Sequence, residues 1–242
     1  TIALHTVFDS PEDKIVWDVS HQVYPHKILT GRKQAYLEEE HYDDVSGYSN
    51  PAESEHDFFE VGHTSTSISL ASGLAMARDL RGGHENIIAV IGDGSMSGGE
   101  ALEGLDTVGE MGTNMIIVLN DNQMSIAEVH GGMYKGFEEL RRTGGKSEHN
   151  LFRAMGLDYR FVADGNDSEA LIKVFREVKD IDHPVVVHIV TQKGKGYKFA
   201  EEDKESWHWH MPFDIETGEV KHPYVDEAAE LTATYLLDRM KT

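Results

Sequence analysis

A carboxylate between two glycines follows an apolar run near the middle of the chain. The run Ile87–Ile91 leads straight into Gly92, Asp93 and Gly94, and a helical pattern begins at Gly99. Glycines let backbone N–H groups approach a phosphate closely, and the first turn of a helix favours an anion. A carboxylate repels phosphate, so the presence of Asp93 predicts a divalent cation between its carboxylate and the phosphate.

A second oxygen-rich tripeptide follows the next apolar run. Met115–Leu119 leads into Asn120, Asp121 and Asn122, about one strand–helix–strand unit after Asp93. Neighbouring parallel strands end at the same edge of a sheet, so the two tripeptides should meet there. Mg²⁺ takes six oxygen ligands, several of which a diphosphate can supply. Either tripeptide alone is typical of a turn, whereas the pair at this spacing predicts Asp93 and Asn122 as magnesium ligands.

The elements that would position these residues alternate between strands and helices. Five short apolar runs read as strands: Lys14–Val19, Ile87–Ile91, Met115–Leu119, Tyr159–Val162 and Val185–Val190. Four segments have helical spacing: Ser65–Leu80, Gly99–Met111, Ser168–Lys179 and Val225–Met240. This alternation predicts an α/β fold, a doubly wound and mostly parallel sheet flanked by helices, with ligands at the carboxyl ends of the strands.

Two polar segments resist assignment, and we predict functional loops or mobile excursions there: Arg32–Phe59 and Ser125–Asn150. A third segment, Gly194–Thr217, is also irregular. Such lengths are unusual for plain connections within a compact domain. No internal repeat is visible in the sequence. We predict a single domain over residues 1–242.

The composition excludes several classes of function. With 43 acidic against 22 basic residues, the net charge is −21, which argues against binding nucleic acid or an anionic membrane surface. No apolar run is long enough to span a membrane and no secretory signal opens the chain. The absence of cysteine excludes disulfides and thiolate metal sites and fits a cytoplasmic location.

Gly-Asp-Gly followed by Asn-Asp-Asn resembles the thiamine diphosphate-binding motif of transketolase-type enzymes. Four further blocks resemble 1-deoxy-D-xylulose 5-phosphate synthases: Trp17–Arg32, Ser54–Asp57 with Gly62–Ser69, Asn120–Ile126, and Lys193–Tyr197 with Ala200–Lys204. These blocks cover nearly the whole chain in the family's order. The resemblance implies the diphosphate-binding domain of an enzyme that joins pyruvate to glyceraldehyde 3-phosphate with loss of CO₂.

Roles can be carried over from the family position by position. The resemblance implies that Asp93, Asn122 and the backbone carbonyl of Met124 ligate Mg²⁺. It also implies that Gly94 and Ser95 donate backbone N–H groups to the diphosphate of thiamine diphosphate, beside Asn122.

Six further residues would surround the cofactor: His21, Gly62, His63, Thr64, Lys193 and Tyr197. His21 would face the reacting carbon, and Lys193 and Tyr197 would close over the diphosphate. Imidazoles suit proton transfer near neutral pH, so His21 and His63 are the predicted catalytic residues. Without the resemblance, His21 reads as structural, His63 as a helix cap and Lys193 as a solvated charge.

The chain also departs from the family pattern. The family's amino-terminal segment, with a further active-site histidine, is not found before Thr1, and the excursion after Ile126 is short. No stretch after Asp203 resembles the pyrimidine-binding domain whose glutamate activates the cofactor. We therefore expect half an active site, completed by a pyrimidine-binding domain in the same chain or a separate one, within a homodimer.

Two other functions stay open at this stage, and a third is disfavoured. One is a transketolase-like enzyme that moves two-carbon units between sugars, and another is a non-catalytic module that binds a diphosphate. A nicotinamide dehydrogenase is disfavoured because no Gly-x-Gly-x-x-Gly opens a strand–helix unit. His208 and His210 alternate around Trp209, a pattern more typical of loop packing than of a metal site.

Overall fold

A computed structural model describes residues 1–19, 23–221 and 227–241, and it divides the chain into two compact units. The first unit is Thr1–Gln192 and the second is Lys193–Thr242. The prediction of a single domain over the whole length stays a prediction. His21 lies outside the described residues.

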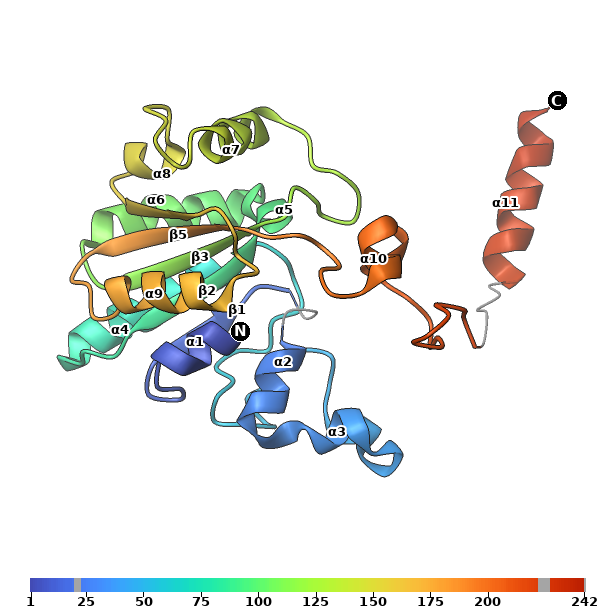
Figure 1. The fold of residues 1–242 in the computed structure, drawn as a ribbon, viewed down its shortest axis with the longest axis horizontal. Helices are drawn as coiled ribbons and strands as arrows, with labels where there is room; N and C mark the ends of the chain where they lie inside the picture. The colour runs from blue at the N-terminus through green and yellow to red at the C-terminus, as the bar shows by residue number, and fades with distance from the viewer. Residues whose placement is uncertain (20–22, 222–226, 242) are drawn as a thin grey trace. The chain divides into compact units, whose positions relative to one another are not determined.

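A five-stranded sheet forms the centre of the first unit (Figure 1). Its strands are β1 (Lys14–Trp17), β2 (Ile87–Gly92), β3 (Met115–Asp121), β4 (Asp158–Val162) and β5 (Pro184–Val190). The order is β1-β2-β3-β5-β4 and every neighbouring pair is parallel. Gly92 pairs with Asn120, so β2 and β3 end side by side. The predicted fold class and all five predicted strands are confirmed.

Helices cover both faces of the sheet because alternate strand residues are apolar on both sides. One face packs against α4 (Ser67–Arg81), α6 (Gly99–Met111), α7 (Gly132–Arg142) and α8 (Leu151–Ala154). The other face packs against α1 (Ile2–Val7) and α9 (Ser168–Val178) (Figure 1). The chain returns from the edge strand β4 to β5 through α9, which packs on the opposite face from α4 and α6.

Local signals in the sequence end and begin these helices as expected. Gly82 and Gly112 follow α4 and α6 in the left-handed conformation that closes a helix. Asp167 caps α9, and its carboxylate accepts backbone N–H groups of Glu169 and Ala170.

The prediction of an irregular segment over Ser125–Asn150 is wrong in its centre, where α7 forms. Its glycines and charged residues hide an amphipathic pattern in which Phe137 and Leu140 are buried in the core. Burial of this stripe outweighs the weak helix propensity of Gly132 and Gly136. The Arg32–Phe59 segment contains short turns of helix, including α3 (Gln34–Leu37), and is otherwise irregular, as predicted.

The second unit contains α10 (Lys198–Glu202), a short 3-10 turn at Ser206–His208 and α11 (Glu227–Met240). The first two fall within the predicted irregular segment Gly194–Thr217. Residues 225 and 226 of the predicted last helix lie outside the described residues. Across the described parts of both units, no helix is long and apolar enough to cross a membrane.

Candidate functional site

Asp93 stands where β2 ends and the short helix α5 (Asp93–Met96) begins. Asp93 is 1% exposed, and neither of its carboxylate oxygens has a hydrogen-bond partner of good geometry among the described residues. A buried carboxylate without partners is strongly unfavourable, so native proteins rarely keep one unless a ligand completes it. The carboxylate of Asp93 could therefore act as an oxygen ligand of a divalent cation.

The surroundings of Asp93 disfavour its ionised form. Burial, and then the charge of Asp121, raise the pKa of Asp93 well above its ordinary value. Backbone N–H groups of Gly94, Gln123 and Asn122 face the carboxylate and oppose this rise, but at poorer geometry than a hydrogen bond needs. A divalent cation at this point would favour the carboxylate form.

Asn122 lies on the loop that directly follows β3, the strand next to β2. Its side-chain oxygen accepts the backbone N–H of Met124 at 3.0 Å, which leaves that oxygen a second lone pair for a cation. The two loops touch, because a Cβ added to Gly94 would lie 2.9 Å from the Cβ of Ser125. The structure thus brings the Gly-Asp-Gly and Asn-Asp-Asn loops together at one edge.

A third loop reaches the same edge from β1. Asp18 follows β1, is fully buried, and accepts the backbone N–H groups of Ser65 at 2.9 Å and Ser67 at 3.0 Å. The Ser65 hydroxyl donates in turn to the carbonyl of Ser95 at 2.7 Å. Asp18 therefore helps to hold the Gly62–Thr66 loop against α5, and it is not among the residues predicted from the sequence.

Backbone strain occurs on three loops at this edge of the sheet: the loop after β1, the Gly62–Thr66 loop and the loop after β3. Four non-glycine residues in the described chain have positive φ, and three of them are Val19 (61°), Ser65 (75°) and Gln123 (66°). A left-handed conformation is unfavourable for any L residue and especially for a β-branched one. Such strain is typical of loops whose shape serves a ligand.

Residues predicted from the resemblance fall into three groups. Gly62, His63 and Thr64 are exposed on the loop held by Asp18. The Nδ1 atom of His63 donates to the carbonyl of Thr64 at 2.6 Å, which leaves Nε2 as the ring acceptor. Gly94 and Ser95 lie in α5, and Met124 lies on the loop after β3.

Lys193 and Tyr197 belong to the second unit. The Nζ of Lys193 lies 2.9 Å from Nδ1 of His208, and the hydroxyl of Tyr197 donates to the carbonyl of Ile215 at 3.1 Å. His210 stacks on Trp207 with ring centroids 4.0 Å apart, so the alternating histidines serve local contacts. The predicted roles of Lys193 and Tyr197 at the diphosphate stay predictions.

A buried polar cluster at the end of β3 was not predicted from the sequence. Asp121 and His188 are both fully buried, and Nε2 of His188 lies 2.9 Å from the Asp121 carboxylate. The hydroxyl of Tyr159 bonds Nδ1 of His188 at 2.7 Å, and Arg141 forms an ion pair with Asp121. Asp121 is part of the Asn-Asp-Asn motif, whereas its partners His188 and Arg141 are distant in the sequence. The sequence therefore did not predict this cluster.

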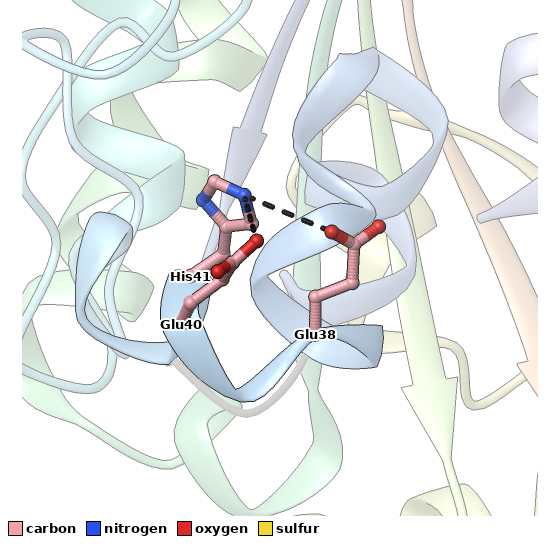
Figure 2. Close-up of side chains that lie close together, drawn as sticks. All are labelled: Glu38, Glu40 and His41. Atoms are coloured by element: carbon pink, nitrogen blue, oxygen red, sulfur yellow. Dashed lines mark ion pairs between the residues drawn. The ribbon is translucent and has the colours of Figure 1, made fainter.

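A different cluster, Glu38, Glu40 and His41, is drawn in Figure 2. Nε2 of His41 lies 3.7 Å from a carboxylate oxygen of each glutamate. Both glutamates are exposed, and Nδ1 of His41 bonds Asp44 at 2.7 Å. These are solvent-exposed ion pairs of small energetic weight, unlike the buried carboxylate of Asp93.

The fold is that of a transketolase-type α/β protein. A transketolase from Leishmania mexicana superposes with a TM-score of 0.57 over 74% of this chain and 28% of that chain. The sequence identity is 19%, so this likeness concerns the fold alone.

The sequence comparison defines the family. The family model described as 1-deoxy-D-xylulose-5-phosphate synthase matches residues 1–148 and 142–191. The chain therefore belongs to the 1-deoxy-D-xylulose-5-phosphate synthase family, as the sequence motifs indicated.

Curated relatives carry the same family name. The 1-deoxy-D-xylulose-5-phosphate synthase 1 of Geobacter metallireducens is 42% identical over 256 residues, which cover 91% of this chain and 41% of that protein. The synthase of Geobacillus thermodenitrificans is 43% identical over 255 residues, covering 90% and 40%. The chain thus spans about two fifths of the length of the curated relatives it matches.

Proposed function

We propose that this chain is the diphosphate-binding part of a 1-deoxy-D-xylulose 5-phosphate synthase and holds thiamine diphosphate through Mg²⁺. The observation that carries the proposal is the buried carboxylate of Asp93, which has no hydrogen-bond partner of good geometry among the described residues. Family membership supports the choice of ligand, since thiamine diphosphate and Mg²⁺ are the family's cofactors.

The proposed ligand set uses oxygens from two loops. Asp93 gives a carboxylate, Asn122 a side-chain carbonyl and Met124 a backbone carbonyl, and the diphosphate and water complete six positions. Backbone N–H groups of Gly94 and Ser95 would bind diphosphate oxygens. Mg²⁺ would neutralise charge at a site within a chain whose net charge is −21.

When bound, the cofactor would supply a nucleophilic thiazolium carbon and a group able to stabilise the negative charge left by loss of CO₂. His63 presents Nε2 as a proton acceptor, because its Nδ1–H donates to Thr64. Gly62 and Thr64 would line the cofactor beside it, and His21 would handle protons at the reacting carbon. Lys193 and Tyr197 would close over the diphosphate.

The remaining half of the site is proposed to come from a pyrimidine-binding domain, in the same chain or a separate one, within a homodimer. The substrates would be pyruvate and glyceraldehyde 3-phosphate. A cytoplasmic location stays a prediction of the sequence.

Binding tests the first half of this proposal. We expect calorimetric titration of the chain with thiamine diphosphate to show binding that requires Mg²⁺ and is abolished by Asp93→Ala. Asp106→Ala removes an exposed carboxylate from α6 and should bind like the wild type. Equal binding by wild type and Asp93→Ala would contradict the metal bridge.

Turnover tests the second half. We expect the 242-residue chain alone to form no product from pyruvate and glyceraldehyde 3-phosphate with both cofactors present. Supplied with a pyrimidine-binding domain, it should use pyruvate as donor. Turnover of a ketose phosphate instead would indicate a transketolase-like activity, and robust turnover by the chain alone would contradict the half-site.

A further inference from the structure

Two carboxylates lie at the ends of neighbouring strands, and their environments differ sharply. Asp93, after β2, has no hydrogen-bond partner of good geometry among the described residues, while Asp121, at the end of β3, is held by several groups. Burial would raise the pKa of Asp121, but the hydrogen bond and charge of His188 and then the charge of Arg141 bring it below the ordinary value. Asp121 therefore stays ionised beside Asp93.

The Asp121 carboxylate joins the metal-ligand loop to two separate elements. One oxygen accepts the backbone N–H of Gln123 at 3.2 Å, and the other meets His188 from β5 and Arg141 from α7. Gln123 directly follows the predicted ligand Asn122 and has φ of 66°. A hydrogen bond at this residue helps to hold a left-handed turn that is otherwise unfavourable.

Arg141 supplies a permanent positive charge in this group. The Tyr159 hydroxyl lies 2.7 Å from Nδ1 of His188, and Nε2 of the same ring lies 2.9 Å from the Asp121 carboxylate. Arg141 is 19% exposed at its side chain and reaches Asp121 from the last turn of α7. The helix α7 also contacts the end of β2, because the hydroxyl of Tyr134 donates to the backbone carbonyl of Asp93 at 3.4 Å.

We propose that Arg141 is a positioning residue for the magnesium site: it holds Asp121 so that the following turn presents Asn122 and Met124 to the cation. This inference rests on the proposed function. Residues that orient metal ligands from behind commonly change metal affinity by about 10- to 100-fold when they are replaced. Arg141 thus links α7, a helix that the sequence did not predict, to the metal.

The test is the Mg²⁺ concentration that half-saturates thiamine diphosphate binding, measured by titration well below the unfolding temperature. We expect Arg141→Gln to raise this concentration about tenfold or more. Arg142→Gln removes a neighbouring, exposed charge from the same helix and should leave it unchanged. Arg141→Lys restores the positive charge and should recover affinity to within about threefold of the wild type.

The lysine variant separates a positioning role from a role in folding. If Arg141 only stabilised the fold, Arg141→Lys would not selectively restore the Mg²⁺ affinity that Arg141→Gln loses. Wild-type affinity in Arg141→Gln would overturn the inference while leaving the proposed function intact. If Arg141→Gln does not fold, Arg141→Lys decides, and a tenfold loss of Mg²⁺ affinity in that folded variant would contradict the charge-based account. Wild-type binding that is independent of Mg²⁺ would overturn the proposed function and this inference together.

Discussion

The two edges of the sheet differ in how completely their buried carboxylates are paired among the described residues. At the amino edge, Asp13 accepts the backbone and side-chain N–H groups of Asn86 at 2.8 and 3.0 Å. Asn86 also exchanges hydrogen bonds with Asp180, at 2.9 Å in both directions. At the carboxyl edge, the equally buried Asp93 has no partner of good geometry among the described residues.

Arg78 completes the amino edge from α4. Its side chain is 2% exposed, and its guanidinium donates to the carbonyls of Glu85 and Asn114 and to the hydroxyl of Thr113. Fully paired groups of this kind stabilise one arrangement of the chain. The contrast supports the proposal that the carboxyl edge binds a ligand, whereas the amino edge stabilises the fold.

The largest expected effect comes from breaking the amino edge. Arg78→Met leaves the carbonyls of Glu85 and Asn114 and the hydroxyl of Thr113 without this donor and should lower the free energy of unfolding by about 3 kcal/mol or more. Arg81→Met on the same helix removes an exposed ion pair with Glu85 and should change it by less than about 1 kcal/mol. Urea unfolding measures both, and equal effects would contradict the assigned role of Arg78.

In the absence of cations, Asp93→Asn should raise the free energy of unfolding, whereas Arg78→Met lowers it. The substitution removes a buried charge that has no partner of good geometry among the described residues, so we expect the metal-free chain to gain about 1–2 kcal/mol. The same variant should lose Mg²⁺-dependent binding of thiamine diphosphate. Asp106→Asn is the surface control, and a metal-free Asp93→Asn chain less stable than the wild type would contradict the contrast between the edges.

The pH dependence sharpens this prediction. Because the pKa of Asp93 is raised on folding, its contribution favours the folded state at low pH and is lost as pH rises through the folded pKa. The stability advantage of metal-free Asp93→Asn should therefore be near zero at about pH 4 and grow with pH. Unfolding curves of both chains across this range, in a chelator, provide the check; a constant difference would exclude ionisation of Asp93 as the cause.

Asp18→Asn should have the smallest effect. The Asp18 carboxylate accepts two backbone N–H groups, those of Ser65 and Ser67, whereas an uncharged amide has only one oxygen acceptor. We therefore expect the free energy of unfolding to fall by about 1 kcal/mol. The Gly62–Thr66 loop should become less well held, and cofactor affinity should fall severalfold. Amide hydrogen exchange at Ser65 and Ser67 reports the loop directly, and unchanged protection would refute this account of Asp18.

Much of the fold could be predicted from the sequence because its signals are local. The Val- and Ile-rich strands carry no polar alternation, and Gly82, Gly112 and Asp167 mark helix ends where the structure has them. The helix α7 escaped prediction because glycines and charges obscure a short apolar stripe whose helical form depends on tertiary packing.

The candidate site divides in the same way. Asp93 and Asn122 could be predicted because each follows a recognisable strand, and parallel pairing places the two strand ends together. The roles of Asp18 and Arg141 could not, since each depends on a contact made across the fold. Sequence order gives no hint that α7 reaches behind β3.

Crystals grown with thiamine diphosphate and Mn²⁺ in place of Mg²⁺ would test the central claim most directly. Anomalous scattering should show one strong peak, with an oxygen of Asp93 and the side-chain oxygen of Asn122 at coordination distance, roughly 2.1 Å. Bound thiamine diphosphate with no metal between these two residues, or a metal held elsewhere in the chain, would contradict the account.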